Sequence, residues 1–153
     1  MRPNVSYRAG GHAPGPEKQL ELLVRRSLAA RWKGRHQVHK YHGDEYSEVG
    51  MPDLFGHVEG RYYGLELKVA HGYFTDGQKQ ALMATYESGA CAAGLLGFKS
   101  TLQQPASYWL LPAPIVMQFS YKDKRSWLPL LVVERGGLTY LNLTPLEVFL
   151  ARP

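Results

Sequence analysis

The sequence predicts one α/β or α+β domain, in which helices flank a mixed central β-sheet. A helix, three strands, a second helix and another strand follow one another along the chain, and further β segments come after them. The length of 153 residues suits one compact domain, and an apolar fraction of 44% suffices for a core. No internal repeat or second domain boundary is recognisable, so we expect a single domain over residues 16–153.

The N-terminal segment differs from the rest of the chain. Residues 1–15 lack periodicity and are rich in Gly, Pro and Arg, which predicts a flexible basic arm. A helix is predicted from Pro16, because Gly15 can act as its N-cap and proline is favoured at the first helical position. On a helical projection Glu17 lies nearer the centre of the apolar stripe than Glu21, so Glu17 is the acid predicted to point towards the core.

The middle of the chain is predicted to contain a β-hairpin. A strand over residues 36–42 and a loop over residues 43–51 precede two strands, 53–58 and 61–69, which would be joined by a turn at Glu59-Gly60. With this turn, His57 would face Tyr62, and the ladder would bring Asp53 opposite Glu66.

The remaining elements follow from local signals. The run TDGQ fits a capping box and predicts a helix that begins after Thr75. Residues 91–98 read as a fully buried strand, and residues 107–111 as another. A hairpin is predicted over residues 128–143, with its turn at Gly136-Gly137, followed by a closing helix from Thr144. Residues 113–127 remain ambiguous and could include a short helix.

Two opposed carboxylates are the most informative feature of the predicted hairpin. Directly opposed side chains in a sheet have Cβ atoms about 5 Å apart, and two negative charges there repel one another. Protonation of one acid or a cation between them relieves the repulsion, and Mg²⁺ prefers such oxygen ligands. By strand alternation Glu66 and Lys68 share a face, so an ammonium group would lie beside the carboxylates of Asp53 and Glu66. The alternative is an exposed hairpin face with scattered charges.

The charge distribution supports a polyanionic partner. The formal net charge is +5, and residues 1–43 carry nine Lys and Arg against two acids. A group of acids follows with a single intervening base, Arg61; the acids are Asp44, Glu45, Glu48, Asp53, Glu59 and Glu66. A basic segment beside an acidic patch suits a polyanionic substrate and a divalent cation, whereas a solvated basic helix without a partner is the alternative.

These residues together resemble the PD-(D/E)XK nuclease superfamily. The motif is present as Pro52-Asp53 followed by Glu66-Leu67-Lys68, and the order of the elements also matches. Residues 49–82 are similar to the virus-type replication-repair nuclease branch, which carries a Gln after the Glu-x-Lys strand. The compact size resembles archaeal-type Holliday junction resolvases and their phage-encoded counterparts. The resemblance covers residues 16–98 and implies a restriction-endonuclease-like core.

The resemblance implies a metal-dependent endonuclease that hydrolyses DNA phosphodiesters. Asp53 and Glu66 would bind one or two Mg²⁺ or Mn²⁺ ions, with the Leu67 carbonyl as a further ligand. Lys68 would position or help activate the attacking water. Glu17, with Glu21 in reserve, would complete the metal site from the first helix.

The same resemblance suggests roles for two further residues, Gln78 and Ser47. Gln78 would orient a water or a contact at the end of the strand, although its place in the capping box is an equally good explanation. Ser47 lies in the loop before the motif, where resolvases of this type often carry a serine that acts in catalysis or contacts the junction.

The resemblance to resolvases implies branched DNA as the partner. Nothing in the chain resembles a base-reading module, so we expect the DNA to be recognised by its shape or structure. The symmetric cutting of two strands implies a homodimer. The single cysteine, Cys91, and the lack of an apolar run of bilayer length predict an intracellular, cytoplasmic protein with no membrane partner. The resemblance to phage-encoded resolvases would suit a protein encoded by a phage. Candidate phosphate contacts are the basic residues Arg25, Arg26, Arg31, Lys33, Arg35, Lys40 and Lys79.

Overall fold

The structure is a computed structural model that describes residues 15–41, 51–69, 73–98, 107–113 and 127–150. Nearly all of the predicted N-terminal arm, most of the loop over residues 43–51 with Ser47, and most of the ambiguous stretch 113–127 lie outside the described residues. Among the residues described, no helix is both long and apolar enough to cross a bilayer.

The first elements of the described residues are α1 (Pro16–Arg31), β1 (His36–Lys40) and the hairpin of β2 (Leu54–Val58) and β3 (Arg61–Val69). Then come α2 (Asp76–Glu87), β4 (Cys91–Phe98) and β5 (Ser107–Pro112). The C-terminal part contains β6 (Leu128–Leu130), β7 (Val132–Arg135), β8 (Leu138–Leu141) and α4 (Thr144–Leu150). Gly15 is the N-cap of α1 and Pro16 its first residue, as the sequence predicts.

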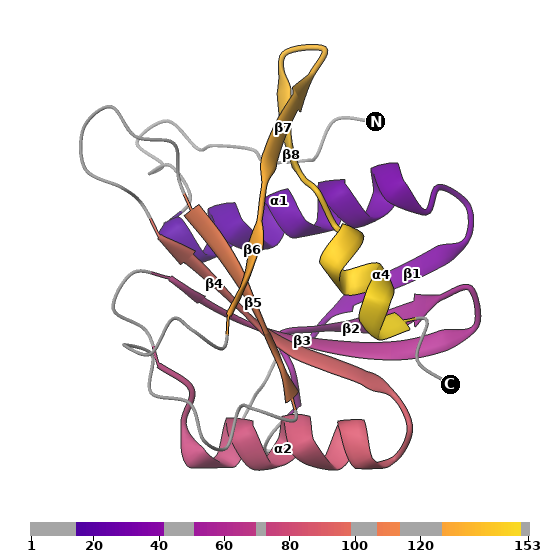
Figure 1. Cartoon of the computed structure of the whole chain (residues 1–153), viewed down its shortest axis with the longest axis vertical. Coiled ribbons are helices and arrows are strands. Elements are labelled where there is room, and N and C mark those ends of the chain that lie inside the picture. Colours follow the sequence, from indigo (N-terminus) through magenta and orange to yellow (C-terminus); the bar gives the residue numbers. More distant parts are fainter. Residues whose placement is uncertain (1–14, 42–50, 70–72, 99–106, 114–126, 151–153) are drawn as a thin grey trace, which may run out of the picture.

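Six strands form one mixed sheet in the order β1-β2-β3-β4-β5-β6. Strands β3 and β4 pair in parallel, because α2 connects them as a crossover, and the other neighbours are antiparallel. Figure 1 shows α1 and α4 on one side of this sheet and α2 on the other. The predicted fold class, a mixed central sheet flanked by helices, is thereby confirmed.

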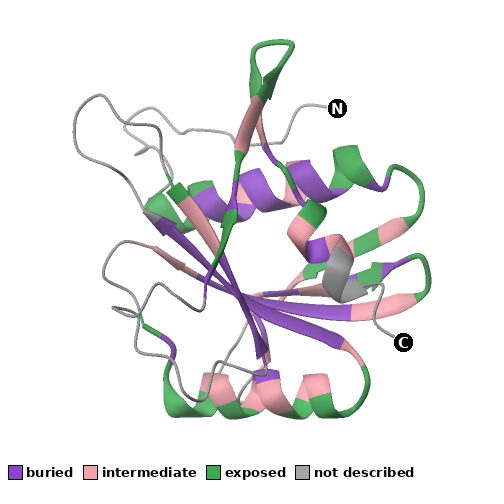
Figure 2. Ribbon diagram, viewed as in Figure 1, coloured by how far each residue is buried: buried purple, intermediate pink, exposed green. Residues whose placement is uncertain are grey.

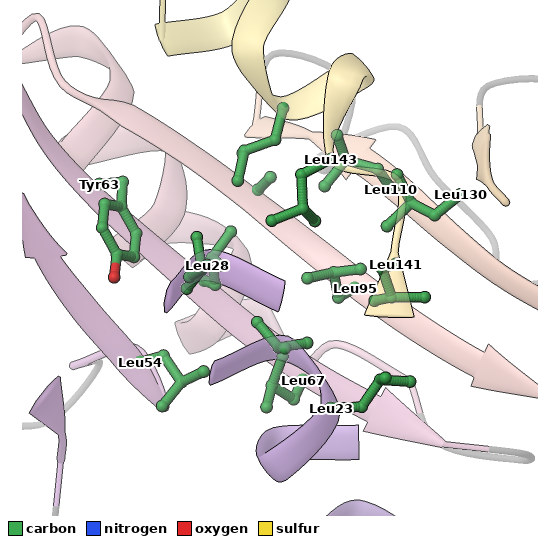
Figure 3. Packing of buried hydrophobic residues seen from close by; sticks show 14 of the residues in the cluster. Leu23, Leu28, Leu54, Tyr63, Leu67, Leu95, Leu110, Leu130, Leu141 and Leu143 are labelled. Atoms are coloured by element: carbon green, nitrogen blue, oxygen red, sulfur yellow. The ribbon is translucent and has the colours of Figure 1, made fainter. Parts of the chain in front are cut away.

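The alternation of side chains along the strands divides the core into two layers. Leu65 and Leu67 of β3 point to the side of α1, where they pack with Leu23, Leu28 and residues of α4 (Figure 3). The smaller layer on the other face contains Leu82 of α2 and further residues of β4 and β5. The central strands are buried along most of their length (Figure 2). A polar side chain within this sheet is therefore largely removed from water.

The predicted hairpin over residues 128–143 is only partly correct. Residues 128–130 form β6, which pairs with β5 at the edge of the large sheet. The hairpin itself consists of β7 and β8, which form a separate two-stranded sheet and turn at Gly136-Gly137 as predicted. The chain leaves the large sheet at Leu131, whose carbonyl accepts a hydrogen bond of 2.8 Å from the Asn142 amide.

Candidate active site

The register of the β2–β3 hairpin is the predicted one. Val58 pairs with Arg61 and Leu54 with Leu65. The turn residues Glu59 and Gly60 have φ angles of 51° and 83°, the left-handed values of a two-residue hairpin turn whose twist matches the strands. Since Leu54 and Leu65 face the α1 layer, the next residues outward, Asp53 and Glu66, face the α2 side together.

Asp53 is held by backbone groups of both neighbouring strands. Its Oδ2 atom accepts a hydrogen bond of 2.8 Å from the amide of Leu67 on β3. Its own carbonyl accepts one of 3.0 Å from the amide of Tyr41, directly after β1. The carboxylate is therefore oriented by the sheet itself, and it uses one oxygen for this purpose. Leu67 contributes its amide here; the predicted role of its carbonyl stays a prediction.

Glu66 is a buried acid with a raised pKa. Only 4% of its surface is exposed. Burial is the main cause that raises the pKa of Glu66 to about 8, and the charge of Asp53 and a hydrogen bond with the Asp53 side chain raise it further. Lys68 lowers this pKa, whereas Glu17 raises it. Asp53, Lys68 and Glu17 thus all act on Glu66, and the sequence predicts all four as residues of the site.

Gln78 combines the two roles that the sequence left as alternatives. Its Oε1 atom accepts a hydrogen bond of 2.9 Å from the Thr75 amide, and its own amide donates one of 3.2 Å to Thr75 Oγ1. This is the predicted capping box. At the same time Gln78 Nε2 donates a hydrogen bond of 2.8 Å to Glu66 Oε1. One amide side chain therefore caps α2 and orients the buried carboxylate.

Close packing between an aromatic ring and a glycine holds the start of α2 above the sheet. Gly94 of β4 pairs with Glu66. A Cβ atom at residue 94 would lie only 2.3 Å from Cζ of Phe74, so the ring occupies the space that a side chain would fill. Phe74 is 5% exposed and stacks on Trp127 with ring centroids 6.1 Å apart. Because Phe74 directly precedes the cap residue Thr75, this contact anchors the end of α2 that carries Gln78.

We expect Thr75→Ala to affect the site through Gln78. The substitution removes the acceptor of the Gln78 amide, and losing such a cap costs about 1 kcal/mol. The first turn of α2 should fray, so that Gln78 orients Glu66 less often. Urea unfolding would measure the stability, and a titration with Mg²⁺ would measure the ion affinity. Ser88→Ala at the other end of α2 removes a hydroxyl group that donates to the Thr85 carbonyl, away from Gln78. An equal loss of Mg²⁺ affinity in both variants would contradict the role of Thr75.

The prediction that Glu17 points towards the core more than Glu21 is wrong. Glu21 is 3% exposed, whereas Glu17 is exposed. The first turn of α1 projects from the sheet with every residue exposed, and Lys40 of β1 covers the next turn. Glu17 nevertheless lies near enough to Glu66 to act on its pKa, and it stays the candidate acid of α1.

Glu21, which the sequence suggests as a reserve metal ligand, is the buried centre of an ion-pair cluster. Its Oε1 atom lies 2.6 Å from Nζ of Lys40, and its Oε2 atom lies 2.5 Å from Nζ of Lys18. Burial raises the pKa of Glu21, but the hydrogen bonds and charges of Lys18 and Lys40 outweigh it, so the net pKa is lowered. Both carboxylate oxygens are thus engaged by lysines.

Glu21→Gln should therefore reduce stability and leave ion binding unchanged. Hydrogen bonds to a charged group contribute about 1.5–3 kcal/mol each, and the two lysines can regain part of this from water because they are partly exposed. We expect a loss of about 1–3 kcal/mol in urea unfolding at pH 7. Titration with Mg²⁺ checks the second half of the prediction; a clear fall in Mg²⁺ affinity would mean that Glu21 is a ligand.

Four of the predicted phosphate contacts have partners within the chain. Arg26 donates to the Thr139 carbonyl at 2.6 Å, and Lys40 is bound to Glu21. Arg31 pairs with an acid of α4, and Arg35 with an acid of the β2–β3 turn. Within the part of the chain that the structure describes, Arg25, Lys33, Lys79 and Lys68 form no ion pair within 4.0 Å. To bind a phosphate, the first four residues would have to exchange a partner within the chain, whereas Arg25, Lys33 and Lys79 would not have to break an ion pair.

The donor set near Asp53 suits a hard divalent cation. Among the described residues, no three Asp, Glu, His or Cys side chains come together as a complete metal cage. Mg²⁺ commonly needs only one or two carboxylates, and takes its other ligands from water and substrate phosphate. Burial is the main cause of the raised pKa of Glu66, and the negative charge of Asp53 adds to it; a cation between the two side chains would relieve that repulsion.

Comparisons with known proteins identify a similar solved structure but no family. No family model matches the chain, and no curated protein matches it. Among solved structures, the chain is similar to a Holliday junction resolvase from the archaeal hyperthermophile Archaeoglobus fulgidus. The match has a TM-score of 0.43 and 19% sequence identity, and covers 60% of this chain and 74% of that one. The function of the present chain must be inferred from its own site.

Proposed function

We propose that this protein is a Mg²⁺-dependent, structure-selective DNA endonuclease of the PD-(D/E)XK superfamily, acting as a Holliday junction resolvase. Mn²⁺ could replace Mg²⁺. One observation carries the proposal: Asp53 and Glu66 meet on one face of the sheet, with Lys68 and Gln78 beside them. Such a convergence of two acids and a lysine in a buried, sheet-supported site suits phosphodiester hydrolysis better than a purely structural role.

The residues divide into an ion-binding pair and its supports. Asp53 and Glu66 would hold the ion, which would supply Lewis-acid stabilisation and lower the pKa of a bound water. The Leu67 amide fixes the orientation of Asp53, and Gln78 fixes that of Glu66. Glu17, on the exposed first turn of α1, could add a ligand through water.

Lys68 would act on the reacting groups themselves. Its ammonium group shares the face of Glu66 and acts on the pKa of that residue, so it lies within electrostatic reach of the ion-binding pair. From there it can position the attacking water and stabilise negative charge that develops on the phosphoryl oxygens. The water oxygen would form the new bond to phosphorus while the 3′-oxygen leaves and takes up a proton, which yields 5′-phosphate and 3′-hydroxyl ends.

The junction substrate and the homodimer rest on the resemblance described from the sequence, including the Gln that follows the Glu-x-Lys strand. A junction needs two cuts of matching position, and two copies related by a twofold axis supply two such sites. The net charge of +5 favours association with DNA and makes binding dependent on salt.

A cleavage assay on defined DNA substrates tests the proposal. Labelled four-way junctions, flaps, duplexes and single strands would be incubated with Mg²⁺, with Mn²⁺ or with EDTA. Symmetric paired nicks in the junction alone, absent in EDTA, are expected. Equal cutting of all substrates would favour another nuclease of the same superfamily, such as a nicking, flap or restriction-like enzyme. Binding without cutting in either metal would instead indicate a non-catalytic nucleic-acid-binding module.

A further inference from the structure

An aromatic surface lies on the same side of the sheet as the candidate active site. On β2, Leu54 and Val58 belong to the core layer of α1, so the alternate residues Phe55 and His57 point to the side of α2. The helix α2 packs mainly against β3 and β4. The side chains of β1 and β2 that point to this side are half-buried or exposed, whereas Leu54 and Val58 are buried. The described helices therefore leave this part of the sheet open to a ligand.

Four rings form two cross-strand pairs on this surface, and we call them the aromatic face. His39 of β1 pairs with Phe55, and their ring centroids are 5.5 Å apart with the planes tilted by 31°. His57 pairs with Tyr62 of β3, with ring centroids 5.7 Å apart and the planes at 74°. His39 and His57 are exposed, whereas Phe55 and Tyr62 are half-buried. Each pair thus combines an exposed ring with one that is held more firmly by its surroundings.

The aromatic face is continuous with the candidate active site along β2. Phe55 follows Asp53 by two residues and His57 follows it by four, so all three side chains point to the same side. At the usual rise of a strand, the Cα atoms of Phe55 and His57 lie about 7 Å and about 13 Å from that of Asp53. If a phosphate of a DNA strand lies at Asp53, the next nucleotides of that strand can reach first one ring pair and then the other.

The chemistry of this surface suits nucleobases better than phosphates or a protein. Between Asp53 and the β2–β3 turn, the residues of β1, β2 and β3 that point to this side are Gln37, His39, Phe55, His57, Tyr62 and Gly64. None of them is Lys or Arg, the residues that usually bind phosphate. Aromatic side chains stack on bases of any sequence, because every base has a flat π-face. A stable protein interface needs about 20–30 residues on each side, far more than four rings.

We propose that the aromatic face stacks on unpaired bases of the DNA strand next to the phosphate that is cut. The His39–Phe55 pair takes the base nearer to the cut, and the His57–Tyr62 pair takes the next base along the strand. This inference rests on the proposed endonuclease function and specifies its substrate. Taking a base out of the duplex stack costs least where the base is already unpaired, so the aromatic face favours branched DNA over an intact duplex.

Two substitutions of Phe55 separate stacking from other roles of this residue. Phe55→Leu keeps an apolar side chain but removes the ring, so we expect about tenfold weaker binding of a labelled four-way junction in EDTA. The slope of binding against salt concentration should stay the same, because no phosphate contact is lost. Phe55→Tyr keeps the ring and should bind within about twofold of the wild type. Equal losses in Phe55→Leu and Phe55→Tyr would contradict stacking.

A matched control removes a ring on the other side of the sheet. Tyr140 of β8 is half-buried like Phe55, and its ring lies 5.5 Å from the guanidinium carbon of Arg26 on α1. Tyr140→Leu should bind the junction within about twofold of the wild type, because the two sites are distant from one another. Fluorescence anisotropy would be measured at a temperature at which thermal unfolding shows every variant to be folded. A loss as large as that of Phe55→Leu would overturn the proposal.

Abasic nucleotides identify the bases that stack, because they keep the phosphate and lack the base. One abasic site would be moved a nucleotide at a time across the branch point of the junction. At one position the difference in affinity between the wild type and Phe55→Leu should vanish, because the base and the ring form one interaction. The difference for Tyr62→Leu should vanish at the adjacent position, farther from the cut. Differences that persist at every position would show that no base contacts these rings.

The failure of the two proposals can be told apart. If the wild type cuts junctions in Mg²⁺ while Phe55→Leu and Tyr62→Leu bind like Tyr140→Leu, the aromatic face has no role in DNA binding and the endonuclease stands. If the abasic sites cancel the effects of the two variants but no DNA is cut, the aromatic face binds bases on a protein without nuclease activity. A wild type that binds no DNA contradicts both.

Discussion

Replacing Asp53 with asparagine should abolish DNA cleavage and leave binding of the junction intact. The amide oxygen of asparagine can still accept the hydrogen bond from the Leu67 amide, so the local backbone is preserved. The negative charge that would hold the ion is lost, and Lewis-acid stabilisation of several kcal/mol goes with it. A loss of this size corresponds to a rate reduction of about 10³-fold or more.

Single-turnover cleavage of a labelled four-way junction measures this effect, with anisotropy in EDTA for binding. Asp76→Asn makes the same chemical change at an exposed acid on the first turn of α2, and it should cut within a few-fold of the wild type. Wild-type cleavage by Asp53→Asn would remove the basis of the ion-binding site. Lost binding together with a lower unfolding temperature would show instead that Asp53 acts mainly in the fold.

The second large effect is a dependence of stability and of ion binding on pH. The pKa of Glu66 in the folded protein, about 8, lies above its ordinary value of 4.5. The folded state therefore holds a proton that the unfolded state releases. This contribution to stability is fully present below about pH 4.5 and is lost as the pH rises to about 8. The loss in the metal-free protein amounts to a few kcal/mol over this window.

A divalent ion competes with that proton for Glu66. Below about pH 8 each unit of pH should therefore change the apparent Mg²⁺ affinity up to tenfold, so that binding at pH 6 is about fiftyfold weaker than at pH 8. Thermal unfolding with and without Mg²⁺ at both pH values measures the effect. Glu66→Gln removes the titrating group and should flatten the pH dependence. An Mg²⁺ shift of the same size at pH 6 and pH 8 would contradict the assignment.

The geometry of the site could be predicted from the sequence where it depends on residues close together in the chain. The two-residue turn at Glu59-Gly60 sets the register, and strand alternation then places Asp53, Glu66 and Lys68 on one face. The Thr75 capping box likewise locates Gln78. What the sequence could not show is that one glutamine both caps the helix and reaches Glu66, since that depends on how α2 sits on the sheet.

The sequence-based predictions were wrong where a residue contacts others that are far from it along the chain. A helical projection of α1 uses only its own residues, so it could not include Lys40, which lies nineteen residues after Glu21 and encloses its carboxylate. The apolar run around Leu131 similarly hides the point at which the chain leaves one sheet for another, because the apolar residues continue from β6 into the start of β7 while the pairing partner changes from β5 to β8.

The contact of Phe74 with Gly94 has a consequence for sequence variation. Gly94 is needed for space and not for its backbone angles, because the ring of Phe74 fills the volume that any side chain at residue 94 would occupy. An alanine at residue 94 would be tolerated only together with a smaller residue at 74. These two positions, twenty apart in the chain, are therefore expected to change jointly among related sequences, in step with the ability of Gln78 to reach Glu66.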